Sequence, residues 1–270
     1  MSAMRNPQKD AWQSDALKLH RGATFGEVSN VGEPVVSGRK RGFPQTGTAV
    51  AISYLPLGGV VLLPCSTGRG GARNRADRVS HALTAANVGN MVSATDHAGL
   101  IEMLFTRMIT IHWKGAGVTL ADMAKASGRF VDLLTKALAR HGSGTAWLGV
   151  HENGDNKGWH FHLLVHVPAA LVPIIQKLQL GWLGIITGKK YRKKVIYSRP
   201  IGKGLGAETR NPDDHAINLA VALGYVCKGA PQAVLDAFSI DRVHEPGGHI
   251  IGKRCATSQN IGAKARKSKD

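Results

Sequence analysis

The chain has 270 residues, of which 43% are hydrophobic and 20% charged, so it can bury a core and is not a fully disordered protein. Its 35 Lys and Arg residues against 18 Asp and Glu give a formal net charge of +17 at pH 7. That balance favours a polyanionic partner, with nucleic acid as the leading candidate, although a ribosome-associated or simply basic protein would share it.

The first hundred residues are poorly patterned. Residues 1–48 are polar and rich in Gly, Pro and Ser, and residues 67–78 (TGRGGARNRADR) form a basic linker. The apolar stretch 49–65 is interrupted by Pro and Gly and is shorter than the roughly 20 residues that span a bilayer, so we predict no membrane segment. We interpret residues 1–100 as a poorly structured, flexible basic extension, with a short helix over 95–107.

The pattern becomes regular after this extension. The apolar, β-branched run RMITIHW (107–113) predicts a strand. Thr119, with Asp122 three residues later, predicts the start of an amphipathic helix that ends at Gly142. TAWLGVHE (145–152) then predicts a second strand.

Strands and helices continue to alternate in the second half. The polar turn NGDNKG (153–158) leads into a third strand, WHFHLLVHV (159–167), and Pro168 begins another helix. A basic loop over 188–206 precedes a last helix over 213–228. This order predicts the α+β class, with an antiparallel sheet on which the helices pack.

The third strand carries a pair of histidines. Side chains alternate between the two faces of a strand, so His160 and His162 share one face while Phe161 and Leu163 face the packed helices. Two imidazoles at this spacing can reach one divalent cation, and buried rings need partners for their nitrogens. We therefore predict a metal site, the alternative being two structural histidines.

A third metal ligand is expected from the neighbouring strand. Glu152 ends that strand across the turn and is the best candidate, unless it is a solvated hairpin residue. The adjacent His151 is a weaker candidate because neighbouring residues point to opposite faces. Two imidazoles and a carboxylate with open positions suit Mg²⁺ or Mn²⁺ acting on phosphate, and Zn²⁺ remains an alternative.

The last helix carries a candidate nucleophile. Tyr225 and Lys228 are three residues apart and hence neighbours on one helix face. A Tyr hydroxyl, with a pKa of about 10, needs help as a nucleophile, and an ammonium can favour the phenolate or neutralise a phosphate. The alternative is an ordinary amphipathic helix edge. Cys227 is interpreted as a small buried residue, because no Cys–His–acid arrangement accompanies it.

Taken in this order, the segments resemble the HUH endonuclease family. RMITIHW is similar to the family's first strand motif, HFH (160–162) to its His–hydrophobic–His motif, and YVCK (225–228) to its YxxK motif. The resemblance implies that His160 and His162 bind metal together with the upstream Glu152. It implies that Tyr225 is the nucleophile and Lys228 its electrostatic partner. Covering about residues 107–266, it is nearest to bacterial plasmid or phage rolling-circle replication initiators.

The resemblance also implies an architecture and a reaction. A ferredoxin-like or RRM-like HUH nicking domain would occupy residues 101–245, between the extension 1–100 and a basic C-terminal tail, 246–270. It would nick single-stranded origin DNA, leave a 5′-phosphotyrosine and a free 3′-hydroxyl, and rejoin strands without a nucleotide cofactor. Because the sequence has no GxxxxGK[ST] phosphate loop, a host helicase is expected as a partner.

Cations and aromatic residues interleave in GKKYRKKVIYSRPIGKG (188–204). Cations can follow phosphates while Tyr191 and Tyr197 stack on unpaired bases, the alternative being a solvated basic loop. With the C-terminal tail, the predicted DNA contacts are Lys189, Lys190, Tyr191, Arg192, Lys193, Lys194, Arg199, Lys203, Lys253 and Arg254.

The three cysteines bear on the compartment. They form no CxxC pair and are odd in number, which argues against a disulfide framework or a cysteine zinc site. Together with the lack of a charged-then-apolar leader, they predict a cytoplasmic protein.

Two other functions stay open at this point. A mobilisation relaxase or a single-tyrosine transposase would use the same chemistry. A non-catalytic basic module on a ferredoxin-like sheet would bind nucleic acid without depending on metal or on Tyr225.

Overall fold

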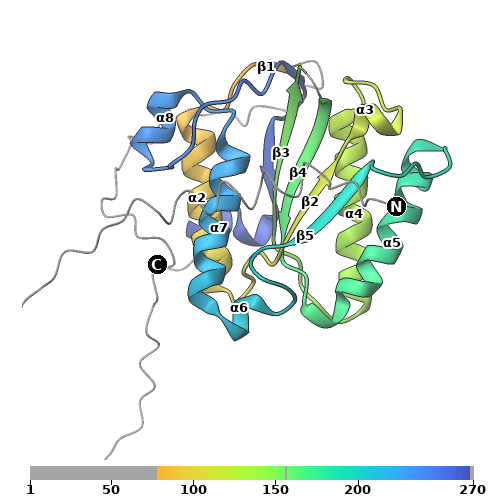
Figure 1. The fold of residues 1–270 in the computed structure, drawn as a ribbon, viewed down its shortest axis with the longest axis horizontal. Coiled ribbons are helices and arrows are strands. Elements are labelled where there is room, and N and C mark those ends of the chain that lie inside the picture. Colours follow the sequence, from red (N-terminus) through yellow and green to blue (C-terminus); the bar gives the residue numbers. More distant parts are fainter. Residues whose placement is uncertain (1–77, 156, 268–270) are drawn as a thin grey trace, which may run out of the picture. The chain divides into compact units, whose positions relative to one another are not determined.

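The computed structural model describes residues 78–155 and 157–267. A five-stranded antiparallel sheet, in the order β5-β2-β4-β3-β7, lies at its centre (Figure 1). Its strands are β2 (Arg107–Ile111), β3 (Trp147–Gly154), β4 (Gly158–Val165), β5 (Ile196–Pro200) and β7 (Cys255–Thr257). A separate two-stranded ladder pairs β1 (Val79–Ser80) with β6 (Ile250–Ile251).

Helices cover both faces of the sheet (Figure 1). On one face lie α2 (Ala85–Leu100) and α7 (Pro212–Cys227), and on the other lie α4 (Met123–Arg140) and α5 (Val172–Thr187). The short helical segments are α3 (Trp113–Ala116), η1 (Ala169–Leu171), α6 (Ala207–Arg210), α8 (Gln232–Ala237), η2 (Gln259–Ile261) and α9 (Ala263–Lys267).

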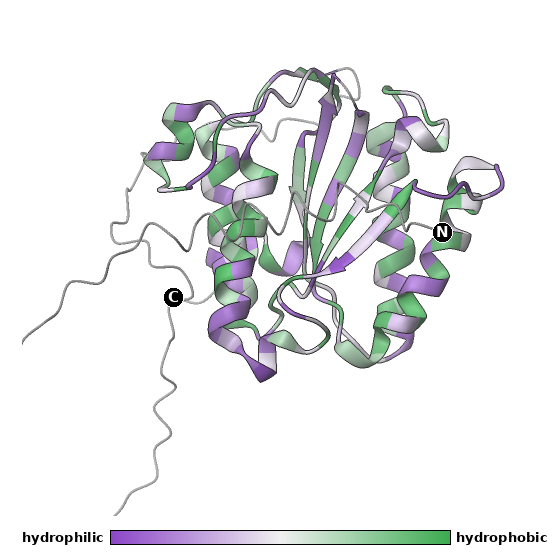
Figure 2. Ribbon diagram, viewed as in Figure 1, coloured by the Kyte–Doolittle hydropathy of each residue, from purple (hydrophilic) through white to green (hydrophobic). Residues whose placement is uncertain are grey.

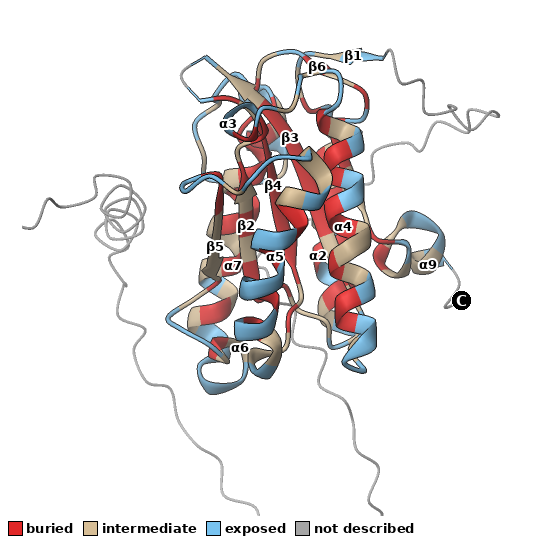
Figure 3. Cartoon of the chain, turned by 90° about the vertical axis from the view of Figure 1, so that its right-hand side faces the viewer, coloured by how far each residue is buried: buried red, intermediate tan, exposed pale blue. Residues whose placement is uncertain are grey.

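Alternation along β4 explains the two layers. Phe161, Leu163 and Val165 belong to the apolar cluster formed with α4 and α5, whereas Leu164 belongs to the cluster formed with α2 and α7. The buried sheet therefore lies between helices whose outer sides are exposed (Figure 3). The predicted α+β class, an antiparallel sheet with helices packed on it, is confirmed.

Local chemistry sets the ends of these elements. The Thr119 hydroxyl accepts a hydrogen bond from the backbone N–H of Asp122 at 3.1 Å, but α4 begins at Met123 with Asp122 as its N-cap, later than the start predicted at Thr119. Gly158, with φ +64°, opens β4 in the left-handed region, which lets the short turn pair Gly154 with Gly158. The turn therefore fixes the register of β3 and β4 on which the site depends.

The fold extends beyond the boundaries predicted at residues 100 and 246. Helix α2 buries Val88 and Met91 in the core and ends at Leu100. Of the helix predicted over 95–107, only residues 95–100 are therefore helical, and residue 107 begins β2. At the other end, β6 and β7 pair with β1 and β3. These segments belong to the fold and not to an extension or a tail. What we predicted for residues 1–77 lies outside the described residues.

In the part of the chain that the structure describes, one helix, Ala169–Thr187, is long and apolar enough to cross a membrane by length and composition, and 28% of its apolar 18-residue window is buried. Ile175, Trp182 and Leu183 pack in the cluster with α4, while apolar side chains such as Ile185 are exposed. A core helix meets the same criterion, so this is weak evidence for a span. The absence of a membrane partner stays a prediction.

Candidate metal centre and tyrosine site

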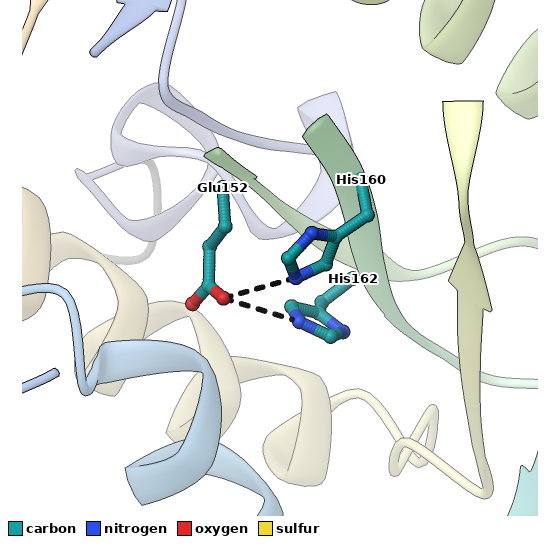
Figure 4. A group of neighbouring side chains, drawn as sticks. All are labelled: Glu152, His160 and His162. Atoms are coloured by element: carbon teal, nitrogen blue, oxygen red, sulfur yellow. Dashed lines mark hydrogen bonds and ion pairs between the residues drawn. The ribbon is translucent and has the colours of Figure 1, made fainter. Parts of the chain in front are cut away.

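Glu152, His160 and His162 meet on the face of the sheet that α7 covers. The antiparallel register places Glu152 directly opposite His160, and alternation along β4 puts His162 on the same face. Figure 4 shows the three side chains pointing toward one another. Oε2 of Glu152 lies 3.1 Å from Nε2 of His160 and 3.4 Å from Nε2 of His162. The sequence prediction that these residues converge is confirmed.

The three side chains are suited to hold a metal ion. One ligand atom from each lies within 4.8 Å of the others, and all three residues are buried. Within residues 78–155 and 157–267, neither Oε1 of Glu152 nor Nε2 of His162 has a hydrogen-bond partner. Buried polar atoms without partners are costly, and a divalent cation would satisfy both of these.

Outer contacts orient both imidazoles toward the carboxylate. Nδ1 of His160 lies 2.8 Å from the carbonyl oxygen of Gly158, which can only accept, so Nδ1 carries a proton and Nε2 is the nitrogen directed at Glu152. Nδ1 of His162 lies 2.9 Å from Oγ1 of Thr110 on β2. Such contacts fix ring orientation at metal sites.

Electrostatics keep the Glu152 carboxylate and the His162 imidazole in the protonation states that cation binding requires. Burial would raise the pKa of Glu152, but His162, His160 and Lys228 together hold that pKa well below its usual range. Burial lowers the pKa of His162, and the Glu152 carboxylate only partly opposes this effect. At neutral pH the site therefore offers an ionised carboxylate and a neutral imidazole at position 162.

Tyr225 and Lys228 lie beside these ligands at the end of α7. The rings of Tyr225 and His162 make an edge contact with centroids 5.1 Å apart. The Lys228 ammonium lies 4.6 Å from the centre of the Tyr225 ring and 3.3 Å from Oε2 of Glu152. The predicted pairing of Tyr225 and Lys228 on one helix face is confirmed, and so is the proximity of both to the histidines.

Burial decides the direction in which the pKa of Tyr225 shifts, whereas neighbouring charges decide the direction for Lys228. Burial raises the pKa of Tyr225, although the positive charge of Lys228 opposes this shift. For Lys228, burial alone would lower the pKa, but Glu152, Tyr225 and Glu245 outweigh it and raise the pKa. The pair therefore rests as a neutral phenol beside a charged ammonium.

Glu245 and Arg242 complete the surroundings of Tyr225 and were not found from the sequence. Oε2 of Glu245 lies 2.8 Å from Nζ of Lys228, and its Oε1 lies 3.6 Å from a terminal nitrogen of Arg242. The guanidinium carbon of Arg242 lies 5.2 Å from the centre of the Tyr225 ring. Both residues come from an irregular segment between α8 and β6, which carries no periodic signal.

His112, just after β2, also joins the site and was missed. Its ring lies 5.5 Å from that of His160 and 5.6 Å from that of Tyr197 on β5, measured between centroids. Burial lowers the pKa of His112 to about 4, with smaller contributions from the nearby histidines and Lys157. Extending the alternation of the predicted first strand from Thr110 by two residues would have found it.

His151, the weaker ligand candidate, does not join the cluster. Its Nδ1 lies 2.8 Å from the carbonyl oxygen of Lys253, and its ring stacks on Phe161 at 4.7 Å between centroids. Burial lowers the pKa of His151 to about 4. As expected from alternation, this side chain lies away from Glu152.

The predicted DNA contacts are divided between surface and interior. The loop between α5 and β5 is hydrophilic (Figure 2), and it exposes Lys189, Lys190, Arg192, Lys193 and Lys194. Lys203 and Lys253 are also exposed, whereas Arg199 is half-buried on β5, on the sheet face of the histidines. Tyr191 is half-buried and packs against the α4/α5 cluster, which leaves less of its ring for stacking.

The prediction for Arg254 is wrong. This side chain is buried and donates to Oγ and the carbonyl oxygen of Ser80, at 3.0 and 2.6 Å, and to the carbonyl oxygens of Gly247 and Gly248. Its hydrogen bonds tie β1 to the segment before β6, so it is a structural residue and not a phosphate contact. The sequence pattern missed this because a buried arginine and a surface arginine look alike without the strand pairing.

Comparisons with protein-family models, with curated proteins and with solved structures give no match to this chain. Its function must therefore be argued from the site itself.

Proposed function

We propose that this protein is a metal-dependent endonuclease that nicks and rejoins single-stranded DNA through Tyr225, as HUH replication initiators do. The supporting observation is the edge contact between the rings of Tyr225 and His162, 5.1 Å apart. It places a phenol beside three potential metal ligands and a buried ammonium in a strongly basic chain. A nucleophile, an electrostatic partner and a cation site together fit phosphoryl transfer.

In the proposed reaction, the phenolic oxygen of Tyr225 attacks the phosphorus of a DNA phosphodiester. The bond from phosphorus to the 3′ oxygen breaks, the phenol gives up its proton, and the leaving oxygen takes up a proton to become a 3′-hydroxyl. The DNA remains attached as a 5′-phosphotyrosine. Attack of a 3′-hydroxyl on that linkage reverses the step and restores the strand, so no nucleotide is consumed.

The chain's own residues divide the work. A divalent cation, Mg²⁺ or Mn²⁺, held by Glu152, His160 and His162 would supply Lewis-acid polarisation of the phosphate oxygens. Lys228 favours the phenolate of Tyr225, whose pKa burial raises, and balances negative charge on the phosphate. Thr110 and the Gly158 carbonyl keep the imidazoles aimed at the ligand position.

The same sheet face offers a path for single-stranded DNA. Tyr197 and Arg199 on β5 face the histidine side of the sheet, and His112 lies between Tyr197 and His160. Unpaired bases can stack on such rings at roughly 1–3 kcal/mol per base, while the exposed cations of the α5–β5 loop follow phosphates. These features favour a single strand over a duplex.

The biological setting we propose is initiation of rolling-circle replication on a plasmid or phage, with a host helicase to unwind the duplex. A mobilisation relaxase or a single-tyrosine transposase would use the same site. Cleavage of the replication origin of the element that carries this gene, and not of a transfer origin or transposon end, would distinguish the initiator.

A covalent-adduct assay tests the proposed chemistry. The full chain is incubated with a random-sequence library of single-stranded oligonucleotides and Mn²⁺, and adducts are resolved under denaturing conditions and mapped by mass spectrometry. We expect an adduct on Tyr225 that Tyr225→Phe and EDTA both abolish. Tyr197→Phe, a matched loss of a hydroxyl on the same face, should retain it. Metal-independent binding without any adduct would instead support a non-catalytic nucleic-acid-binding module.

A further inference from the structure

A carboxylate lies between two cations at the ring of Tyr225. Glu245 contacts Lys228 through one oxygen, at 2.8 Å, and Arg242 through the other, at 3.6 Å. Both cations also lie close to the Tyr225 ring, at 4.6 and 5.2 Å from its centre. One singly charged oxyanion is therefore held by two positive groups next to the candidate nucleophile.

The segment that carries this carboxylate is fixed, while its side chain is accessible. The Glu245 N–H donates to the carbonyl oxygen of Lys228 at 2.9 Å, and the Gly247 carbonyl accepts from the N–H of Asn153, at the end of β3, at 2.7 Å. The Glu245 side chain is nevertheless 52% exposed, compared with 11% for Lys228. Rotation of one side chain into solvent would leave both cations facing the same point.

Lys228 does not need Glu245 for charge balance. It already contacts Glu152, a buried carboxylate, at 3.3 Å. A phosphodiester carries the same single negative charge as a carboxylate and likewise presents two oxygens, so it can replace Glu245 between Lys228 and Arg242 without changing the local charge.

We propose that Lys228 and Arg242 form a phosphate-binding subsite beside Tyr225, and that the Glu245 carboxylate occupies this subsite until a DNA phosphate displaces it. The inference rests on the proposed function for the identity of its ligand, a phosphodiester of single-stranded DNA. Arg242 becomes a further phosphate-contacting residue, and Glu245 a competitor that any bound phosphate must replace.

The sign of the Glu245 effect separates this subsite from a structural ion pair. If Glu245 only supports the fold, neutralising it weakens the protein and its binding. If Glu245 competes with phosphate, Glu245→Gln tightens binding. A partly exposed ion pair of this kind contributes up to about 1 kcal/mol, so we expect affinity for single-stranded DNA to rise about fivefold.

The test uses the full chain, a fluorescent mixed-sequence single-stranded oligonucleotide and EDTA, so that binding is measured by anisotropy without chemistry. Asp241→Asn is the matched control, because it removes one negative charge from an exposed position in the same segment. Glu245→Gln should tighten binding clearly more than Asp241→Asn. Thermal unfolding of each variant reports whether it is folded.

Arg242→Gln provides a second, independent readout. Loss of one phosphate contact should weaken binding and reduce the slope of log affinity against log salt by about 0.7. The control is Arg140→Gln, because Arg140 is an exposed arginine at the end of α4. Arg140→Gln alone should weaken binding less, and combined with Glu245→Gln it should leave the tighter binding intact. Combining Arg242→Gln with Glu245→Gln should instead cancel most of that gain.

The two proposals can fail separately. Equal affinities for Glu245→Gln and Asp241→Asn, or an unchanged salt slope in Arg242→Gln, would overturn the phosphate subsite even if the wild-type protein forms an adduct. If these binding effects are seen but no adduct forms with Mn²⁺, the subsite stands and the nicking activity does not.

Discussion

Replacing one imidazole of the metal site should remove most of the thermal stabilisation that a divalent metal gives this protein. His162→Gln removes one of three ligand atoms that lie within 4.8 Å of one another. The matched control is His166→Gln, just after β4, because both histidines use Nδ1 in a hydrogen-bonding contact, His162 with Thr110 and His166 with the carbonyl oxygen of Leu104. Of these two histidines, only His162 belongs to the cluster with Glu152.

The expected size of the effect follows from mass action. At a Mn²⁺ concentration 100 times its Kd, binding to the folded state stabilises it by about 2.7 kcal/mol. For a domain of roughly 150–250 residues, each kcal/mol corresponds to about 2–4 °C, so the midpoint should rise by about 5–11 °C. A lost ligand that weakens affinity about 100-fold leaves only about 0.4 kcal/mol, or about 1–2 °C.

The assay is a thermal unfolding scan at pH 7.5 with and without Mn²⁺, followed by circular dichroism. At that pH the pKa of His162, lowered by burial, leaves its ring neutral and able to bind. Wild type and His166→Gln should show the full shift, and His162→Gln should lose most of it. A full shift in His162→Gln would place the ion elsewhere, and no shift in wild type would refute the metal site.

Three further outcomes are expected for residues around the site. The pKa of His151 is lowered from 6.5 to about 4, so as pH falls the unfolded chain binds this proton first and the free energy of unfolding decreases. In chemical denaturation, wild type should lose about 2 kcal/mol more than His151→Gln between pH 7.5 and 5. Arg254→Ala should cost about 2–4 kcal/mol in urea unfolding, because one buried and two part-buried carbonyl groups lose their donor, and DNA affinity at low temperature should not change. Gly149→Ala should cost about 1–3 kcal/mol, because a Cβ there would overlap the Phe161 ring, and Gly128→Ala on α4, which has open space, should not destabilise.

Much of the site could be predicted because it depends on short-range periodicity. Alternation with a period of two places His160 and His162 on one face, and the short turn sets Glu152 against His160. A spacing of three on a helix pairs Tyr225 with Lys228. None of these inferences requires knowledge of which distant segments meet.

The missed features depend on how distant segments close on one another. Helix α2 consists largely of small residues (AANVGNMVSATDHAGL), whose apolar stripe is faint, so its burial is decided by tertiary packing. Arg254 is distinguished from a surface cation only by the pairing of β1 with β6. Arg242 and Glu245 reach Tyr225 through backbone contacts of their segment with Lys228 and Asn153, which no local pattern encodes.

The charges around Tyr225 link the two proposed ligands. Burial raises the pKa of the phenol, and the negative charges of Glu152 and Glu245 raise it further, against the opposing effect of Lys228. A cation bound by Glu152 would neutralise one of these charges, and displacement of Glu245 would remove the other from the ring. Both events act in the direction that favours the phenolate, although the arriving phosphate restores one negative charge. The phenol of Tyr225 is therefore expected to respond more to the cation than to DNA.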